Sequence, residues 1–448
     1  MGYDVAIYGS GFAGFSAARA ALRDGLSVIV VERGPGNDLL ASVKHASVAS
    51  PWEPVQSGGF DFGVPELKAF AHVPRFFGLG GTSMLWAGKW RPLDPVDFAR
   101  RNGERAWPFG PAEIEPSVKA VSDLFGVAIK PGLATAAPLD RCCSAGLRIV
   151  PIRVEAEPTR LAQLWARLEV NPRLTVVTDV AKTHFHLANG RLVGVDLERP
   201  GGHRQDIEAR YHVVGAGGIE SAHLVYQLAS SATGRTRTYL GGYMDHPKGE
   251  VGRFYSPSRN LDALDALLDP EAGYILTLGL PEQELLDNGL GNHTLFLWGR
   301  SRRQLGWKSL YSRREIRLVV NVDQFPEETK QIDLSTQNTV RWRISGETRG
   351  NLNRFLDRIL PRVEGFWGKI DRVSWCDLRG AGHPAGCTPF AHTPDAFQLH
   401  PDGRVAFLDN VFCASSVAFP FAGSANPTLT IAALGHRIGA ALSRLARP

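Results

Sequence analysis

The sequence predicts an α/β protein in which a doubly wound, mainly parallel sheet is combined with an α+β region that contains an antiparallel sheet. Residues 4–8 (DVAIY) and 27–31 (SVIVV) are short apolar runs typical of buried parallel strands, and an alanine-rich helical stretch at 15–24 separates them. Between residues 249 and 344, strand-like runs at 294–298, 316–322 and 339–344 are separated by irregular stretches, which indicates an antiparallel sheet. A further helix is predicted at 351–366.

The composition is that of an ordinary globular protein. The 448 residues carry 50 Lys and Arg against 45 Asp and Glu, and this small excess of positive charge argues against a nucleic-acid partner. One stretch, 300–317, interleaves basic residues with aromatic ones. It is either a solvated or lid-like loop, or a docking patch for an acidic partner or a membrane surface.

The cysteines and apolar runs bear on metal sites and location. None of the five cysteines has the paired spacing of a zinc or iron–sulfur site, so we expect no metal: Cys142, Cys143, Cys376, Cys387 and Cys413. Scattered thiols fit a reducing compartment. The first strand is predicted to start by Tyr3, which leaves no signal peptide, and no apolar run approaches the ~18 residues of a membrane span. We expect a cytoplasmic protein without an integral membrane segment.

A glycine-rich turn joins the first strand to the first helix. In Gly9-Ser10-Gly11-Phe12-Ala13-Gly14, the first glycine allows a tight turn, Gly11 lets the backbone approach a pyrophosphate, and Gly14 lets the helix lie close to the sheet. The free N–H groups of the helix favour phosphates. Glu32, at the end of the second strand, can accept hydrogen bonds from ribose hydroxyls and would repel a 2′-phosphate. The unit predicts a Rossmann-like dinucleotide site for FAD or NAD, and the lack of a second such motif favours a flavoprotein.

Four further motifs follow in order. They are the glycine-rich loop 78–83 (GLGGTS), GHPAGC at 382–387, FLDNVFCASSVAFP at 407–420 and GSANPTLTIAALGHRIG at 423–439. With the N-terminal turn, they make the chain, from Tyr3 to about Ala441, resemble the glucose-methanol-choline (GMC) family of flavoprotein oxidoreductases. Trp86-Ala87-Gly88 after the glycine loop, and Ser-Ser-Val before Pro420, are similar to the sugar- and polyol-oxidising branch.

The resemblance implies FAD and assigns its contacts. It places Val180 at the adenine through its backbone, and Asn426 near the isoalloxazine, where the start of the last helix faces flavin O2. It assigns Gly9, Gly11, Gly14 and Glu32 to the ADP half, and Gly80, Gly81, Thr82, Ser83, Ser415, Pro427 and Thr428 to the flavin side. The other implied cofactor-binding residues are Phe12, Ala13, Arg33, Trp86 and Gly215.

The resemblance also implies the domain division and the catalytic pair. Residues 1–45, 70–130, 165–240 and 376–448 would form the FAD-binding domain, and 46–69, 131–164 and 241–375 the substrate-binding domain. His383 matches the family's base, and histidine suits proton abstraction because its ordinary pKa is about 6.5. Asn426 takes the partner position and would hydrogen-bond the substrate oxygen. His246, in Asp-His-Pro, is read as a packing or loop residue.

Two departures from the family pattern limit what the resemblance implies. Cys387 and the residues after it replace a segment that often contains Arg and Met, which leaves the substrate open. Leu85 occupies the position where some members carry a histidine linked to the flavin, so we expect non-covalent FAD. The chain is also short for the family, which suggests an open site that admits a bulky substrate.

The predicted function is oxidation of a substrate alcohol to a carbonyl by proton abstraction and hydride transfer to flavin N5. The substrate would be a sugar, polyol, glycoside or similar metabolite, and the electron acceptor oxygen or another redox carrier. The alternatives are an FAD-containing lyase, a flavin-linked decarboxylase, and a flavin-binding protein without turnover. Anaerobic bleaching of the flavin by an alcohol would separate the first prediction from the others.

Overall fold

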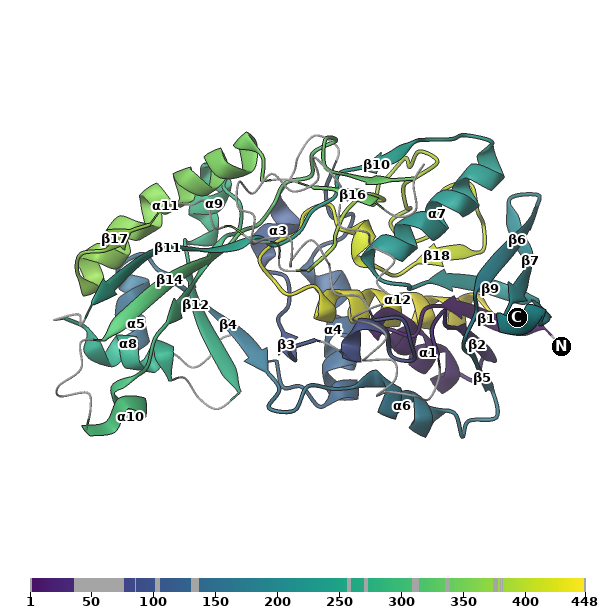
Figure 1. Cartoon of the computed structure of the whole chain (residues 1–448), viewed down its shortest axis with the longest axis horizontal. Coiled ribbons are helices and arrows are strands. Elements are labelled where there is room, and N and C mark those ends of the chain that lie inside the picture. Colours follow the sequence, from purple (N-terminus) through teal and green to yellow (C-terminus); the bar gives the residue numbers. More distant parts are fainter. Residues whose placement is uncertain are drawn as a thin grey trace.

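The computed structural model places two sheets towards opposite ends of an elongated molecule (Figure 1). It describes residues 2–35, 76–84, 86–100, 105–129, 137–255, 259–269, 273–307, 314–334, 339–342, 344–373, 378, 380 and 382–446. The α/β class predicted from the sequence is confirmed, with a parallel sheet in one part and an antiparallel sheet in the other.

The parallel sheet has the strand order β18-β9-β1-β2-β5. All of its neighbouring strands run in the same direction, as expected for strands that are apolar along their whole length. Its strands are β1 (Tyr3–Tyr8), β2 (Val28–Val31), β5 (Leu174–Val177), β9 (Ala209–Val214) and β18 (Val411–Cys413). Segments from both ends of the sequence therefore build one sheet, which brings the N-terminal and C-terminal motifs into the same region.

Helices surround this sheet. They are α1 (Phe12–Arg23), α4 (Pro111–Phe125), α6 (Leu161–Leu168), α7 (Gly218–Thr233) and α12 (Thr428–Leu445). Helix α12 lies between α1 and α4, and His436 Nδ1 and Ser117 Oγ, 3.1 Å apart, join it to α4. Trp165 of α6 is fully buried against Phe15 of α1.

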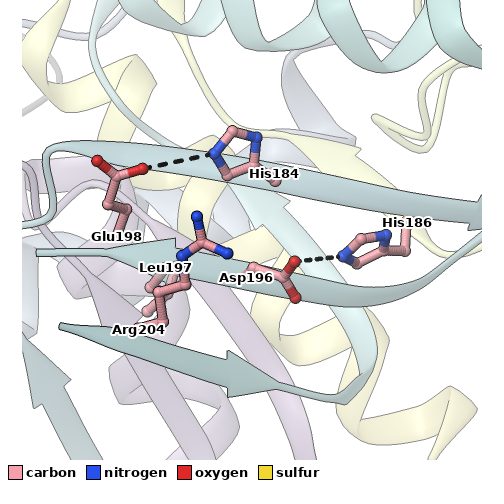
Figure 2. Close-up of a pocket in the computed structure, with 6 residues that line it drawn as sticks. All are labelled: His184, His186, Asp196, Leu197, Glu198 and Arg204. Carbon is pink, nitrogen blue, oxygen red and sulfur yellow. Dashed lines mark ion pairs between the residues drawn. The ribbon is translucent and has the colours of Figure 1, made fainter. Parts of the chain in front are cut away.

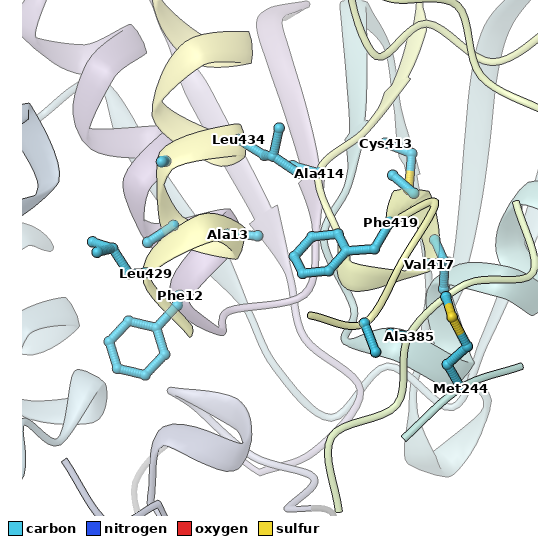
Figure 3. Packing of buried hydrophobic residues seen from close by; sticks show 14 of the residues in the cluster. Phe12, Ala13, Met244, Ala385, Cys413, Ala414, Val417, Phe419, Leu429 and Leu434 are labelled. Carbon is cyan, nitrogen blue, oxygen red and sulfur yellow. The ribbon is translucent and has the colours of Figure 1, made fainter. Parts of the chain in front are cut away.

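The close packing of α1 on α12 depends on two glycines. A Cβ added at Gly435 would lie 2.2 Å from the carbonyl oxygen of Ala13, and one at Gly439 would lie 2.4 Å from that of Ala17. The residue numbers of the two contacts rise together, so the helices run parallel and their N-termini point the same way. Figure 3 shows Ala13 of α1 beside α12, which carries Leu429 and Leu434.

Replacing Gly435 with alanine is expected to lower the free energy of unfolding by about 1–3 kcal/mol, because the new methyl group overlaps the backbone of α1. Gly350 is the matched control: it lies inside a helix, and a Cβ there would meet nothing within 4 Å. Gly350→Ala should stabilise the protein by up to about 1 kcal/mol. Urea denaturation measures both, and equal effects of the two substitutions would contradict the close packing.

The antiparallel sheet has the order β17-β11-β14-β13-β12-β4-β3. Its strands are β3 (Lys89–Trp90), β4 (Arg148–Val154), β11 (Lys248–Tyr255), β12 (Tyr274–Gly279), β13 (Thr294–Trp298), β14 (Glu315–Asn321) and β17 (Asp371–Arg372). Figure 1 shows the long helix α11 (Gly346–Trp367) along this part of the molecule. The shorter helices α5 (Ala137–Ser144) and α8 (Leu261–Leu268) pack on each other near β12.

The other elements are short. They comprise a sheet of β6 (Lys182–Ala188), β7 (Arg191–Glu198) and β8 (Arg204–Ile207), a sheet of β10 (Tyr239–Gly241), β15 (Gln331–Asp333) and β16 (Thr339–Arg341), the helices α3 (Pro95–Ala99), α9 (Glu282–Asp287) and α10 (Arg302–Leu305), and the 3-10 turns η2 (Gly81–Met84), η3 (Pro200–Gly202) and η6 (Ser416–Ala418).

Some predicted bounds differ from the structure. The strand predicted at 339–344 ends at Arg341 and belongs to the small sheet with β15. Helix α11 begins five residues before the predicted start, because the Ser345 hydroxyl accepts the N–H of Thr348 and caps the helix there. Among the described helices, none combines the length and apolar character needed to span a membrane.

Candidate active site

The glycine turn after β1 is shaped by contacts with its own backbone and with Gly215, the residue that follows β9. A Cβ at Gly9, which has a φ of +105°, would lie 2.6 Å from the carbonyl oxygen of Gly215, and one at Gly14 would lie 2.0 Å from that of Gly9. A Cβ at Gly11 would meet nothing within 4 Å. Gly9 and Gly14 are therefore needed for the fold, whereas Gly11 opens onto free space at the N-terminus of α1.

Ser10 connects the turn to Glu32. The Ser10 hydroxyl donates to Glu32 Oε2 (2.6 Å) and accepts the N–H of Gly80 (2.9 Å), and the Ser10 N–H donates to the same carboxylate oxygen (3.1 Å). Glu32 Oε1 accepts the N–H of Gly34 (3.0 Å). Burial raises the pKa of Glu32, although these hydrogen bonds oppose the rise. The carboxylate is fixed at the end of β2, the position expected for a ribose contact.

These features fit the ADP half of FAD. The N-terminus of α1 has no side-chain cap and no acidic residue in its first turn, so among the described residues no side chain caps its N–H groups in place of a phosphate. The free space at Gly11 lies at that helix end. The Phe12 ring packs on Trp86 and Trp90, with centroids 4.7 and 5.4 Å apart, which leaves only the Phe12 backbone for a contact with the cofactor.

The glycine-rich loop 78–84 packs directly against this turn. A Cβ at Gly81 would lie 3.4 Å from Gly11 Cα, so the two loops face each other. The Ser83 hydroxyl donates to the Gly80 carbonyl (2.7 Å) and accepts the N–H of Leu161 (3.2 Å), which attaches the loop to α6. Thr82 is exposed. Leu85, the residue on which the prediction of non-covalent FAD is based, lies outside the described residues.

Arg160 is a residue that the sequence analysis missed. Its guanidinium donates to the carbonyl oxygens of Ser83 (2.9 Å) and Trp86 (3.0 Å), and the Trp86 ring N–H donates to the Thr159 carbonyl (2.8 Å). Arg160 thus holds the loop from a position 77 residues away. No motif marks it, because its role depends on long-range contact.

Two further residues implied in cofactor binding, Val180 and Arg33, have protein partners of their own. The Val180 N–H donates to the Glu32 carbonyl oxygen (3.2 Å), so a backbone contact to adenine would use the Val180 carbonyl. Arg33 lies 3.8 Å from Glu220 and 5.2 Å above the ring of Phe77. Both lie close to Glu32, at the same edge of the parallel sheet.

The loop that carries His383 is anchored by Asp245. The Asp245 carboxylate accepts the backbone N–H groups of His383 (2.8 Å), Gly382 (3.2 Å) and His246 (2.6 Å). Met244 and Ala385 form a two-way backbone bridge beside it, and Figure 3 shows these two side chains next to each other. Asp245 therefore fixes the backbone of both histidines through their N–H groups.

His246 lies against His383, with their Nδ1 atoms 3.1 Å apart. The other nitrogen of His246, Nε2, is 3.0 Å from the carbonyl oxygen of Ala422, which only accepts hydrogen bonds. His246 therefore carries its proton on Nε2 and accepts from His383 at Nδ1. This assigns the His383 proton to Nδ1 and leaves its Nε2 lone pair free; Nε2 has no hydrogen-bond partner among the described residues.

Electrostatics keep His383 neutral. Burial lowers its pKa well below 6.5, and the neighbouring His246, Lys248 and Lys89 lower it further. Burial also lowers the pKa of His246. A neutral imidazole with a free nitrogen can take up a proton.

The segment before α12 carries Asn426 and is held by buried charges. The Gly423 N–H donates to Asp323 Oδ1 (2.8 Å), and Arg100 forms an ion pair with the other Asp323 oxygen. Burial alone would raise the pKa of Asp323, but Arg100 and the surrounding donors lower it, so the carboxylate stays charged. The Arg100 guanidinium lies over the rings of Phe325 and Phe421, at 4.6 and 4.7 Å from their centroids.

Asn426 is half-buried, and within the described part of the chain its amide has no hydrogen-bond partner. Pro427 takes the N-cap position with helical angles (φ −71°, ψ −14°), and Thr428 is the first residue of α12, one later than predicted. Ser415 donates to the carbonyl oxygen of Gly217 (3.0 Å) and so connects η6 to the start of α7. The free amide and the uncapped helix start are available to a bound group.

A separate hollow of about 270 Å³ lies on the small sheet of β6, β7 and β8 (Figure 2). His186 pairs with Asp196 at 2.8 Å and His184 with Glu198 at 3.8 Å, and all four side chains are largely exposed or half-exposed. Exposed pairs of this kind contribute little. We assign no catalytic role to this hollow.

Comparison with known proteins supports the cofactor and the fold. A family model described as an FAD binding domain matches residues 4–55. The chain is 23% identical to 6'''-hydroxyparomomycin C oxidase of Streptomyces lividus, and the match covers 98% of this chain and 91% of that relative. It is 21% identical to 2-methyl-1,2-propanediol dehydrogenase of Mycolicibacterium austroafricanum, and the match covers 98% of this chain and 95% of that relative. Pyridoxine 4-oxidase from Mesorbium loti has the same fold, with a TM-score of 0.60, 15% identity and 98% of both chains covered.

The N-terminal match and the whole-chain likeness define an FAD-dependent oxidoreductase. The shared fold agrees with the resemblance to the GMC family seen in the sequence.

Proposed function

We propose that the protein oxidises a hydroxyl group of a small molecule to a carbonyl, with His383 as the base. The observation that supports this best is the fixed tautomer of His383, whose Nδ1–H is donated to His246 while Nε2 is free. Two of the relatives, by name an oxidase and a dehydrogenase, match nearly the whole chain. Bound FAD supplies a hydride acceptor.

The protein's own groups would divide the remaining work. His383 Nε2 takes the hydroxyl proton, and the positive charge that forms is shared across the hydrogen bond to His246. The Asn426 amide donates to the substrate oxygen as negative charge develops there, a contribution of ~2–4 kcal/mol by analogy with single oxyanion donors. Gly11 and the N-terminus of α1 hold the pyrophosphate, and Glu32 the ribose.

Anaerobic mixing with candidate alcohols tests this proposal. The FAD-loaded protein should lose its absorbance near the flavin maximum when the substrate is added without oxygen, and regain it when an acceptor is admitted. A lyase would turn over its substrate with no bleaching. A flavin-binding protein without turnover would show neither change.

Asp245→Asn tests whether the anchored loop matters for the chemistry. Asparagine keeps the volume but turns one acceptor oxygen into a donor, which opposes either the N–H of Gly382 at Oδ2 or those of His383 and His246 at Oδ1. We expect the rate constant of flavin reduction to fall at least ~10-fold, because the base is displaced, while FAD stays bound. Asp409→Asn, on an exposed carboxylate, is the control. An unchanged rate in Asp245→Asn would remove the anchor from the mechanism.

A further inference from the structure

A cavity of about 330 Å³ in the antiparallel sheet is lined by two lysines, neither of which pairs with a carboxylate among the described residues. Lys89 begins β3 and Lys248 begins β11, and these strands lie on opposite sides of β13 in the sheet order. Both ammonium groups nevertheless lie near one side chain, Phe296 of β13, at 6.0 and 5.4 Å from its ring centroid. The sheet thus presents both charges to the same cavity.

The rest of the lining carries no negative charge. It consists of apolar and aromatic residues, among them Leu267, Leu276, Phe296, Val319 and the exposed Trp298. No carboxylate lies within ion-pair distance of either lysine in the described ranges. Two ammonium groups that are half removed from water, near each other and without an anion, are unfavourable for the empty protein.

This cavity is close to the proposed base. Lys248 directly follows the Asp245-His246-Pro247 loop, and both lysines lie near enough to His383 to lower its pKa. Burial lowers the pKa of both lysines, and repulsion from Lys89 helps to bring that of Lys248 to about 8, against a smaller opposing effect of Asp245. At neutral pH, Lys248 is therefore largely charged.

We propose that Lys89 and Lys248 bind an anionic oxygen group of the substrate, so that the alcohol oxidised at His383 belongs to a hydroxy acid or a phosphorylated alcohol. This inference rests on the proposed function. An anion between the two ammonium groups relieves their repulsion, and the apolar wall with Phe296 and Trp298 covers the carbon skeleton next to it. Neutral alcohols leave the charges uncompensated and are expected to be poorer substrates.

Matched pairs of alcohols test the charge preference in the FAD-loaded enzyme. The pairs are sorbitol and gluconate, benzyl alcohol and 4-(hydroxymethyl)benzoate, and glycerol and glycerol 3-phosphate, so that carboxylate and phosphate are compared separately. We expect kcat/KM for anaerobic flavin reduction to favour the charged member of at least one pair by ~10-fold or more. Equal values within every pair that reacts would overturn the inference.

Variants of Lys89 and Lys248 test whether these two residues cause the preference for charged alcohols. In the double variant Lys89→Met and Lys248→Met, the charged-to-neutral ratio of kcat/KM should fall at least ~10-fold, and the corresponding Lys→Arg variant should keep it. Lys182→Met, on an exposed lysine that pairs with Glu198, is the control and should leave the ratio unchanged. If the Met variant slows both members equally, the lysines act on the flavin rather than on a substrate anion, and the inference fails.

Binding separates this inference from the proposed function. Benzoate should bind to the FAD-loaded protein at least ~10-fold more tightly than benzamide, and the double Met variant should lose the difference, as measured by flavin absorbance or thermal shift. If no alcohol bleaches the flavin, the proposed function fails, and the benzoate comparison still decides whether the cavity binds anions. Equal binding of benzoate and benzamide would exclude an anion site.

Discussion

His383→Ala is expected to retain FAD and to reduce it with an alcohol at least ~10²-fold more slowly than the unaltered protein. The substitution removes the Nε2 lone pair that the His246 and Ala422 contacts leave free. The backbone N–H of residue 383 still donates to Asp245, so the loop keeps its anchor. Anaerobic stopped-flow absorbance measures the rate, and the ratio of flavin to protein absorbance measures retention.

The control is His184→Ala, which removes an exposed histidine on β6. It should leave the rate within twofold of the unaltered protein, roughly the effect of a surface substitution. A normal rate in His383→Ala would remove this residue from the mechanism. Loss of bound FAD in that variant would mean that the imidazole holds the cofactor rather than the substrate proton.

The lowered pKa of His383 predicts the pH profile of flavin reduction. Because the pKa of His383 lies well below 6.5, the neutral base persists as the pH falls through 6.5. Protonation then removes the base, so the rate should decline only at lower pH. The acid limb of the profile for a neutral alcohol should therefore lie below 6.5. An acid limb at or above 6.5 would contradict the assignment.

Gly11→Ala and Gly14→Ala are expected to differ sharply, although both alter the same turn. The methyl group at residue 11 enters free space in the protein, so the chain should fold normally. That space is where the pyrophosphate comes close to the backbone, so FAD affinity should fall ~10-fold or more. Flavin titration and urea denaturation of the cofactor-free protein measure the two effects.

At Gly14, the methyl group would lie 2.0 Å from the Gly9 carbonyl oxygen, a backbone atom that cannot move away easily. We expect a loss of stability of about 1–3 kcal/mol or failure to fold, independent of added FAD. If Gly11→Ala destabilised the cofactor-free protein as much as Gly14→Ala, the assignment of the free space to the cofactor would be wrong.

The part of the fold that was predictable from the sequence is the part that depends on local pattern. The run of apolar residues in β1 and β2 and the glycines between them determine a strand, a turn and a helix within a short stretch, and β13 matches its prediction residue for residue. The start of α11 was misplaced because its cap, Ser345, lies outside the apolar period that predicted the helix.

The site was predicted only where a motif carries it. His383 follows from GHPAGC, but its contact with His246 joins residues 137 positions apart, and no spacing in the sequence encodes that distance. His246 was read as a packing residue for this reason. Arg160 and the lysine pair were missed on the same ground, since contacts between distant segments, rather than a sequence pattern, bring Lys89 and Lys248 near Phe296.

The parallel packing of α1 on α12 has a consequence for the order of assembly. Helix α1 is made early in synthesis, but the glycine face that closes over it belongs to α12, at the other end of the sequence. Contacts of such large sequence separation form late, after the intervening loop entropy has been overcome. Nascent chains that lack α12 should therefore remain unable to retain the cofactor, and flavin capture should be among the last steps of folding.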